Sequence, residues 1–453
     1  MKQLANSSFL KLTFIFSIVF LTGLINQLSY AQEVITIQQA VDKTLTNNLQ
    51  VKQSKLSESL SDENLKQSKL ALYPTLNSGI NQNMNWGRNQ GVSGLFENTQ
   101  RYILGANLNS GADLFNGFSK LNQIKQNKTL LDAGKTNTDK VKNDLILQVI
   151  TSYLQILYNK DFLRAAEDQL MVAKQQLNQQ QELLNEGNKT LADLSQSKSQ
   201  VATAELNITN AANALSISYL TLAQLMEVPS STVYDVQLPV IASFKNGMTQ
   251  VNADQIYRDA LNIFPDIKLA ELNTAASKIG VDVARGNLYP RLSMNASYGS
   301  NYFYSYNSIF PNAALTDQFK NNLGKGIGLN LSIPIFNGLQ ARSGVTRAKI
   351  NFMQNETQEQ LVKNNLNRIV YQAVADLKAA EARYESTTNA FLAQKDAYYV
   401  IEERYNVGLV NSLDYSTAQT NRNRAEIDMI QAKYDLLFRA KVIDYYLGKQ
   451  ISF

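Results

Sequence analysis

The residue types that most often carry chemistry in proteins are either missing from this sequence or scattered along it. Its 453 residues include no cysteine and no histidine, which excludes a cysteine nucleophile, a disulfide, a Cys/His zinc site and a histidine general base. Aspartate and glutamate are plentiful, but they stand singly along helical faces, where solvated surface charges are common. Gly324, Gly326 and Gly328 alternate with other residues, which is a strand pattern and not a phosphate-binding loop. We therefore expect no enzyme activity and no catalytic, cofactor-binding or metal-binding residue.

Two glycine-containing segments with matching spacing are the best candidates for a functional site. Gly187 and Gly408 are each followed six residues later by an aspartate, Asp193 and Asp414, and Tyr405 stands three residues before the second glycine. Glycine at the end of a helix permits a left-handed cap, and a helical pattern resumes a few residues beyond each glycine. Each segment is therefore predicted to be the tip of a helical hairpin.

The two tips belong to an internal duplication. An offset of 221 residues relates Gly187 to Gly408 and also Phe115-Asn116-Gly117 to Phe336-Asn337-Gly338, while Leu72-Tyr73-Pro74 recurs as Leu288-Tyr289-Pro290 at an offset of 216. A repeat of this length is a duplicated module of domain size and not a solenoid of small units. We expect a first repeat over 32–226, a linker of 227–250 that contains Pro229 and Pro239, and a second repeat over 251–453.

The first 31 residues have the pattern of a secretory signal peptide. Lys2 and Lys11 precede an apolar run over 12–25, and Ser29-Tyr30-Ala31 has the small-x-small pattern of a cleavage site. The alternative, a membrane anchor, is disfavoured because the run is shorter than the roughly 20 residues that a spanning helix needs. Removing the signal changes the formal net charge from +5 to +3 because two lysines are lost, and so small a charge does not indicate a nucleic-acid partner.

Four segments alternate between apolar and polar residues in the manner of β-strands. We predict strands over 76–87, 101–114, 292–304 and 323–335, paired as two β-hairpins. Leu108 and Leu329 fall on apolar faces, whereas asparagines and glycines such as Asn107 fill the opposite face. The strands are as long as tilted membrane strands, so a membrane barrel or a soluble sandwich fits the pattern. Four strands cannot close a barrel, and closure would need two copies with eight strands or three copies with twelve.

Long helices are predicted where proline is absent. The segments 118–186 and 340–407 contain no proline and keep helical apolar spacing, and each would extend for roughly 100 Å as one helix. Shorter helices are expected over 37–72 and 253–288, before the two hairpins. Each repeat would therefore consist of a shorter helix, a β-hairpin, a long helix, a tight tip and a returning helix.

A secreted chain with this duplicated order resembles the TolC-like outer-membrane efflux proteins over residues 33–449. The most specific similarity is the segment 404–414, which is similar to the second tip of that family, and the segment around Gly187 is similar to the first. The resemblance implies an α+β membrane protein of long α-helical hairpins, whose two β-hairpins form part of a trimeric 12-strand β-barrel in the outer membrane. It also implies a homotrimer in contact with outer-membrane lipid, a periplasmic helical tunnel, and a periplasmic adaptor and an inner-membrane transporter as partners.

The resemblance assigns roles to the tip residues. A hydrogen bond between Tyr405 and Asp193 would hold the tips shut, and Asp414 would contribute to an acidic constriction. The sequence departs from the family pattern at Val410 and Thr417, where the best-known tip has charged residues, so fewer charged latches are expected here. Type I protein secretion uses the same architecture, and a secreted coiled-coil scaffold is the alternative from another class of protein.

Overall fold

The computed structural model describes residues 33–90, 94–231, 234–238, 252–306 and 311–448. The expected signal peptide therefore lies outside the described residues. The first half of the chain contains β1 (Glu33–Ile35), α2 (Ile37–Asn47), α3 (Leu49–Leu70), β2 (Thr75–Gln90), β3 (Phe96–Phe115), α4 (Ser119–Asn185), α5 (Leu191–Met226) and β4 (Tyr234–Val236). The second half contains α6 (Ala253–Ile263), α7 (Pro265–Arg285), η2 (Gly286–Leu288), β5 (Arg291–Ser305), α8 (Leu315–Asn321), β6 (Gly324–Ser332), α9 (Gln340–Asn406) and α10 (Ser412–Tyr446).

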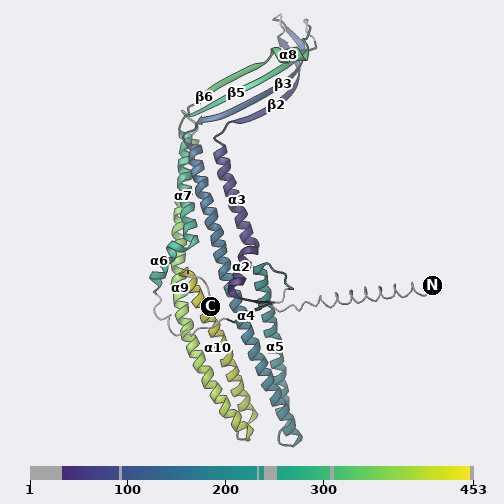
Figure 1. The fold of residues 1–453 in the computed structure, drawn as a ribbon, viewed down its shortest axis with the longest axis vertical. Coiled ribbons are helices and arrows are strands. Elements are labelled where there is room, and N and C mark those ends of the chain that lie inside the picture. The colour runs from purple at the N-terminus through teal and green to yellow at the C-terminus, as the bar shows by residue number, and fades with distance from the viewer. Residues whose placement is uncertain (1–32, 91–93, 232–233, 239–251, 307–310, 449–453) are drawn as a thin grey trace, which may run out of the picture.

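The molecule is elongated, with a β-sheet at one end and two helical hairpins at the other (Figure 1). The two predicted long helices are confirmed as α4 and α9, which have 67 residues each. Gly134 and Gly344 lie inside these helices without interrupting them. Their buried apolar stripes, such as Val149 in α4 and Val370 in α9, pack against the returning helices in the two main core clusters. Among the described residues, none of the helices combines the length and the apolarity that crossing a bilayer requires.

The two shorter helices are each divided, which corrects the prediction of single helices over 37–72 and 253–288. Asn48 separates α2 from α3 with extended backbone angles, and its side chain accepts a hydrogen bond of 2.8 Å from the backbone N–H of Gln50. Phe264 separates α6 from α7 and is followed by Pro265 at the first helical position. A residue before proline is driven out of the helical region, and an asparagine cap starts a new helix. Both signals are local, so the sequence contained them.

All four predicted strands join one antiparallel sheet in the order β2-β3-β5-β6, so the two hairpins lie side by side (Figure 1). The register keeps the two faces separate across the whole sheet. Leu108 lies opposite Tyr298, and Met294 lies opposite Leu329, on the apolar face. On the polar face, Asn107 lies opposite both Gly79 and Gly299. The alternation predicted for the separate strands thus becomes one apolar and one polar sheet surface.

The last strand is shorter than predicted, because β6 covers only 324–332 of the expected 323–335 and a short helix, α8, precedes it. Side chains in α8 and just before it form hydrogen bonds with the backbone of β5, at the part of its edge that β6 does not cover. Gln318 accepts a hydrogen bond from the backbone N–H of Phe303 and donates one to its carbonyl oxygen, each at 2.9 Å. Asn312 makes the same pair of contacts with Ser305. These carboxamides replace a neighbouring strand, which explains why β5 extends beyond β6.

The predicted linker 227–250 contains a strand that the sequence analysis missed. β4 pairs in parallel with β1 near the start of the chain, and both strands pack into the core formed by α4, α5 and α10. The hydroxyl of Tyr153 donates toward the carbonyl oxygens of Ile35 and Gln237, at 3.0 and 2.8 Å. The three-residue strands are too short to show an alternating pattern, so only their partners reveal them.

Candidate gate at the tips of the helical hairpins

The two tips are glycine turns with the same geometry, as the sequence predicted. Gly187 and Gly408 both have a φ of 77°, the left-handed conformation that glycine adopts without strain. The backbone N–H after each glycine donates to the last turn of the preceding helix: Asn188 bonds to Leu183 and Leu409 to Arg404, both at 2.8 Å. These bonds satisfy carbonyl groups that a helix end otherwise leaves unpaired.

The returning helices begin with capping residues. Thr190 and Asp193 form a capping box at the start of α5, in which the side chain of each bonds to the backbone N–H of the other. At the start of α10 the side chain of Asn411 accepts a hydrogen bond of 2.8 Å from the backbone N–H of Asp414. Asp414 itself is exposed in the first helical turn, where a carboxylate also interacts favourably with the helix dipole.

At the tips, two hydrogen bonds of the described residues join the first helical hairpin, α4 and α5, to the second, α9 and α10. The hydroxyl of Ser412 donates to Oδ1 of Asp193 at 2.6 Å, and Nε2 of Gln180 donates to the hydroxyl oxygen of Tyr405 at 2.6 Å. The ammonium of Lys189 also lies 5.0 Å from the centre of the Tyr405 ring, within the range of a cation–π interaction. The tips of one chain are therefore held together by contacts between residues far apart in the sequence.

The predicted hydrogen bond between Tyr405 and Asp193 is replaced by these two contacts. The carboxylate of Asp193 already accepts hydrogen bonds from Thr190 and Ser412, and the hydroxyl of Tyr405 is directed to Gln180. The prediction therefore named two residues of the interface between the hairpins but paired them wrongly. Neither Gln180 nor Ser412 stands out in the sequence, because each is an ordinary polar residue on a helical segment.

The environment of the tip changes the acidity of both predicted residues. Hydrogen bonds from Ser412 and Thr190, helped by the charge of Lys189, lower the pKa of Asp193 to about 2, because they stabilise the carboxylate. Burial raises the pKa of the Tyr405 hydroxyl, and the negative charge of Asp193 contributes to the increase. At neutral pH Asp193 is therefore a charged carboxylate, and Tyr405 is a neutral phenol.

Tyr405 belongs to a small tyrosine cluster inside the second hairpin. Its ring stacks on Tyr415 with 4.6 Å between the centroids, and the hydroxyls of Tyr398 and Tyr415 lie 2.7 Å apart. All three rings are buried, so this tip has an aromatic core of its own. Tyr398 and Tyr405 stand seven residues apart, two helical turns, and this spacing was a signal that the sequence analysis left unused.

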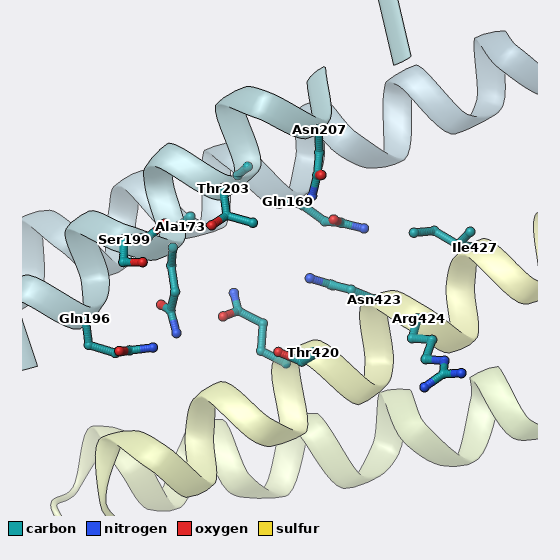
Figure 2. Close-up of a pocket in the computed structure, with 13 residues that line it drawn as sticks. Gln169, Ala173, Gln196, Ser199, Thr203, Asn207, Thr420, Asn423, Arg424 and Ile427 are labelled. Carbon is teal, nitrogen blue, oxygen red and sulfur yellow. Dashed lines mark hydrogen bonds between the residues drawn. The ribbon is translucent and has the colours of Figure 1, made fainter. Parts of the chain in front are cut away.

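A polar cleft of about 380 Å³ lies next to the tips, between α4 and α5 on one side and α10 on the other (Figure 2). Its labelled side chains approach each other from the two hairpins, and most of them are uncharged amides and hydroxyls. Nε2 of Gln169 and Oε1 of Gln200 are buried there without a hydrogen-bond partner in the described part of the chain. The exposed amides and hydroxyls of the lining, such as Gln196, Ser199 and Thr203, can form hydrogen bonds with a molecule that enters the cleft, and Arg424 adds a charged group.

Comparison with known proteins shows that nearly the whole chain is similar to outer membrane efflux proteins. The family described as "Outer membrane efflux protein" matches residues 40–227 and 256–449. The efflux protein BepC of Brucella suis is 23% identical over 420 residues, which cover 89% of this chain and 85% of BepC. TolC of Escherichia coli is 24% identical over 307 residues, which cover 67% of this chain and 61% of TolC.

Solved structures show the same fold at lower identity. The outer membrane protein VceC of Vibrio cholerae superposes with a TM-score of 0.77 at 16% identity, covering 92% of this chain and 97% of VceC. The CmeC outer membrane channel of Campylobacter jejuni also reaches a TM-score of 0.77, at 18% identity, and the alignment covers 91% of this chain and 85% of CmeC.

Proposed function

The chain belongs to the outer membrane efflux protein family, and from this we propose that it is the passive exit duct of a tripartite export system. The observation that carries the proposal is the combination of a two-faced β-sheet at one end of the molecule with two helical hairpins at the other (Figure 1). The sheet would lie in the outer membrane and the hairpins would extend through the periplasm. No catalytic step is needed, because the transporter partner supplies the energy.

A homotrimer would close the sheet into a barrel. Within the described chain the sheet has two free edges, β2 and β6, and unpaired strand edges are not tolerated in lipid because no water can bond to them. Three copies of a four-stranded sheet give twelve strands, with the apolar face toward lipid and the asparagine- and glycine-rich face toward a water-filled lumen. A sheet with one apolar and one polar face fits a membrane only as part of a closed barrel, so the proposal requires several copies of the chain.

The helices would continue this lumen as a periplasmic tunnel. At 1.5 Å per residue, α4 and α9 each extend roughly 100 Å, several times the thickness of a hydrocarbon core. This length separates the tips from the sheet and leaves them in the periplasm. The tips are then the part of the duct that can meet an inner-membrane assembly.

We assign gating and adaptor docking to the tips, with Gly187, Asp193, Tyr405, Gly408 and Asp414 as their functional residues. Outward movement of one helical hairpin relative to the other at the tips would break the two hydrogen bonds that join them there. The glycine turns give both tips their shape, and the exposed carboxylate of Asp414 would face the opening or the adaptor. The neighbouring polar cleft would offer hydrogen-bonding groups to a docking helix.

Membrane extraction and co-purification test the proposal. The protein should fractionate with the outer membrane, require detergent for extraction, migrate as a trimer and bring a periplasmic adaptor and an inner-membrane transporter with it after mild crosslinking. An ATP-driven transporter would favour type I protein secretion, and a proton-driven pump would favour efflux of small molecules. A monomer that stays in solution without detergent would instead support the secreted coiled-coil alternative and overturn the duct.

A further inference from the structure

Positive charge is concentrated where the two long helices meet the sheet (Figure 1). The segment 118–131, at the start of α4, contains no aspartate or glutamate, and neither does the segment 339–355, at the start of α9. Together these segments contain six basic residues, one more than the formal net charge of +5 of the whole chain. The six are Lys120, Lys125, Lys128, Arg342, Arg347 and Lys349. The charge excess of the chain is therefore local to this junction.

Only one of these basic side chains is paired within the described residues. The ammonium of Lys120 lies 2.9 Å from the carboxylate of Asp113, which also binds Arg291 at 2.7 Å. The other five side chains are exposed, and in the part of the chain that the structure describes they form no ion pair. Exposed cations without carboxylate partners remain available to an anionic ligand.

Two of the unpaired lysines share a helix face with apolar residues. Phe118, Leu121, Lys125 and Lys128 follow each other at intervals of three, four and three residues, which places them on one face of a helix. Phe118 and Leu121 are 59% and 47% exposed. The second repeat has the same order, from apolar to basic, at the positions 221 residues further on, which are Leu339, Arg342, Thr346 and Lys349.

This helix face continues the apolar face of the sheet. The ring of Phe118 packs edge-on against Phe115, with 5.3 Å between the ring centres. A shift of register between Asp113 and Phe115 places Phe115 opposite Leu292, which lies on the same side of β5 as Met294 because alternate residues share a face. Phe118 and Leu121 therefore lie on the side of the molecule that would face lipid.

A shallow hollow of about 530 Å³ opens on this side of α4. It is lined by Phe118, Leu121, Asn122, Ile124 and Lys125, so most of its wall is apolar and one of its members is a cation. The Cα–Cβ bonds of a helix tilt toward the start of that helix, and α4 starts beside the sheet. This tilt brings the side chains of Lys125 and Lys128 closer to the level of the hollow.

We propose that Phe118, Leu121, Lys125 and Lys128 form a binding site for an anionic phospholipid of the periplasmic leaflet. An acyl chain would occupy the hollow, and the two lysines would donate hydrogen bonds to the phosphate of the headgroup. This inference rests on the proposed exit duct, in which the sheet lies in the outer membrane. A phospholipid matches the site because it combines an apolar chain with a negative charge, whereas a soluble anion would leave the apolar wall uncovered.

The position of the lysines fits the headgroup layer. At 1.5 Å per residue, Lys125 and Lys128 lie about 10 and 15 Å from Phe118 along the helix. With Phe118 at the edge of the hydrocarbon, the lysine stems can run along the apolar surface and place their ammonium groups among the headgroups. Basic side chains just outside a bilayer attract anionic lipids in this way.

Native mass spectrometry of the full-length protein in detergent tests the site. Phosphatidylglycerol and phosphatidylcholine with the same acyl chains are the two probes, since only the first has a net negative headgroup. Each basic side chain near an anionic lipid surface contributes roughly a five-fold preference. Lys125→Ala with Lys128→Ala should therefore reduce binding of phosphatidylglycerol by roughly 30-fold and leave binding of phosphatidylcholine unchanged.

The matched control is Lys135→Ala with Lys174→Ala, which removes the same charge from exposed positions of the same helix. Lys135 lies about 25 Å from Phe118 along α4, and Lys174 lies further away, so this variant should bind both lipids like the original protein. Leu121→Gln should weaken binding of both lipids, because the hollow loses an apolar wall while both lysines remain.

Equal loss of phosphatidylglycerol in the two double variants would overturn the site, because the effect would then depend on total charge. Displacement of phosphatidylglycerol by inorganic phosphate would also overturn it and indicate a site for soluble anions. A trimer that inserts into membranes without a preference for phosphatidylglycerol would overturn the lipid site and leave the exit duct intact. A monomer that needs no detergent would overturn the duct, and the lipid site with it.

Discussion

The hydrogen bond between Gln180 and Tyr405 is the most sensitive point of the contact between the two hairpins. Both side chains are buried, with Gln180 only 1% exposed, and Nε2 of Gln180 donates to the Tyr405 hydroxyl oxygen at 2.6 Å. Oε1 of the same glutamine is buried without a partner among the described residues. Replacing Tyr405 with phenylalanine would therefore leave both ends of this amide unpaired.

The size of the effect follows from the cost of an unpaired buried group. Leaving a buried donor unsatisfied costs about 1 to 3 kcal/mol, which corresponds to roughly a 5- to 150-fold change in the equilibrium between joined and separated hairpins. In a trimer whose three subunits move together, the total would be about 3 to 9 kcal/mol. Tyr405→Phe should therefore shift the proposed gate strongly toward its open state.

Single-channel recording in planar bilayers measures this shift as higher conductance or longer openings. Tyr399→Phe is the matched control, because Tyr399 lies on the same helix but is 61% exposed, and it should behave like the original protein. Adding Gln180→Met to Tyr405→Phe removes the unpaired amide and should partly restore closure, since replacing both partners of a buried hydrogen bond is less costly than replacing one. Unchanged conductance in a stable Tyr405→Phe trimer would refute the role of this contact.

Three further predictions concern the tips and the sheet. The pKa of Asp193 lies at about 2, below its ordinary value of 3.8. The contribution of this carboxylate to gate closure should therefore be complete above about pH 4 and lost only as the pH falls toward 2. A conductance change between pH 5 and 8 that disappears in Asp193→Asn would contradict this. Gly408→Val forces a β-branched residue into a positive φ at a cost of about 1 to 3 kcal/mol and should abolish export in a cell-based assay while trimers still insert; normal export would exclude this tip from docking. Leu329→Arg should destabilise the trimer by about 2 to 4 kcal/mol if the side chain faces lipid at midplane, as measured by the temperature at which trimers dissociate, whereas Asn109→Arg should be tolerated; equal damage at both positions would contradict the assignment of the faces.

Much of the architecture was readable from the sequence because it depends on local patterns. Long stretches without proline predicted α4 and α9, and the glycines at 187 and 408 predicted both tips, since helix continuation and helix ends are decided by neighbouring residues. Alternation of apolar and polar residues predicted the four strands and their faces. The division of the shorter helices at Asn48 and before Pro265 was also encoded locally, although the prediction of single helices overlooked it.

The contacts between distant segments were decided only by the tertiary structure. Asp193 and Tyr405 were identified as tip residues, but their partners Ser412 and Gln180 come from the other hairpin, and no local pattern specifies which polar side chains meet across two helical hairpins. The pairing of β1 with β4 was hidden for the same reason, because three-residue strands have no periodicity and exist only through their partner. The sequence by itself therefore determined the long helices, the four long strands and the two tips, and packing in three dimensions determined which residues hold the two helical hairpins together.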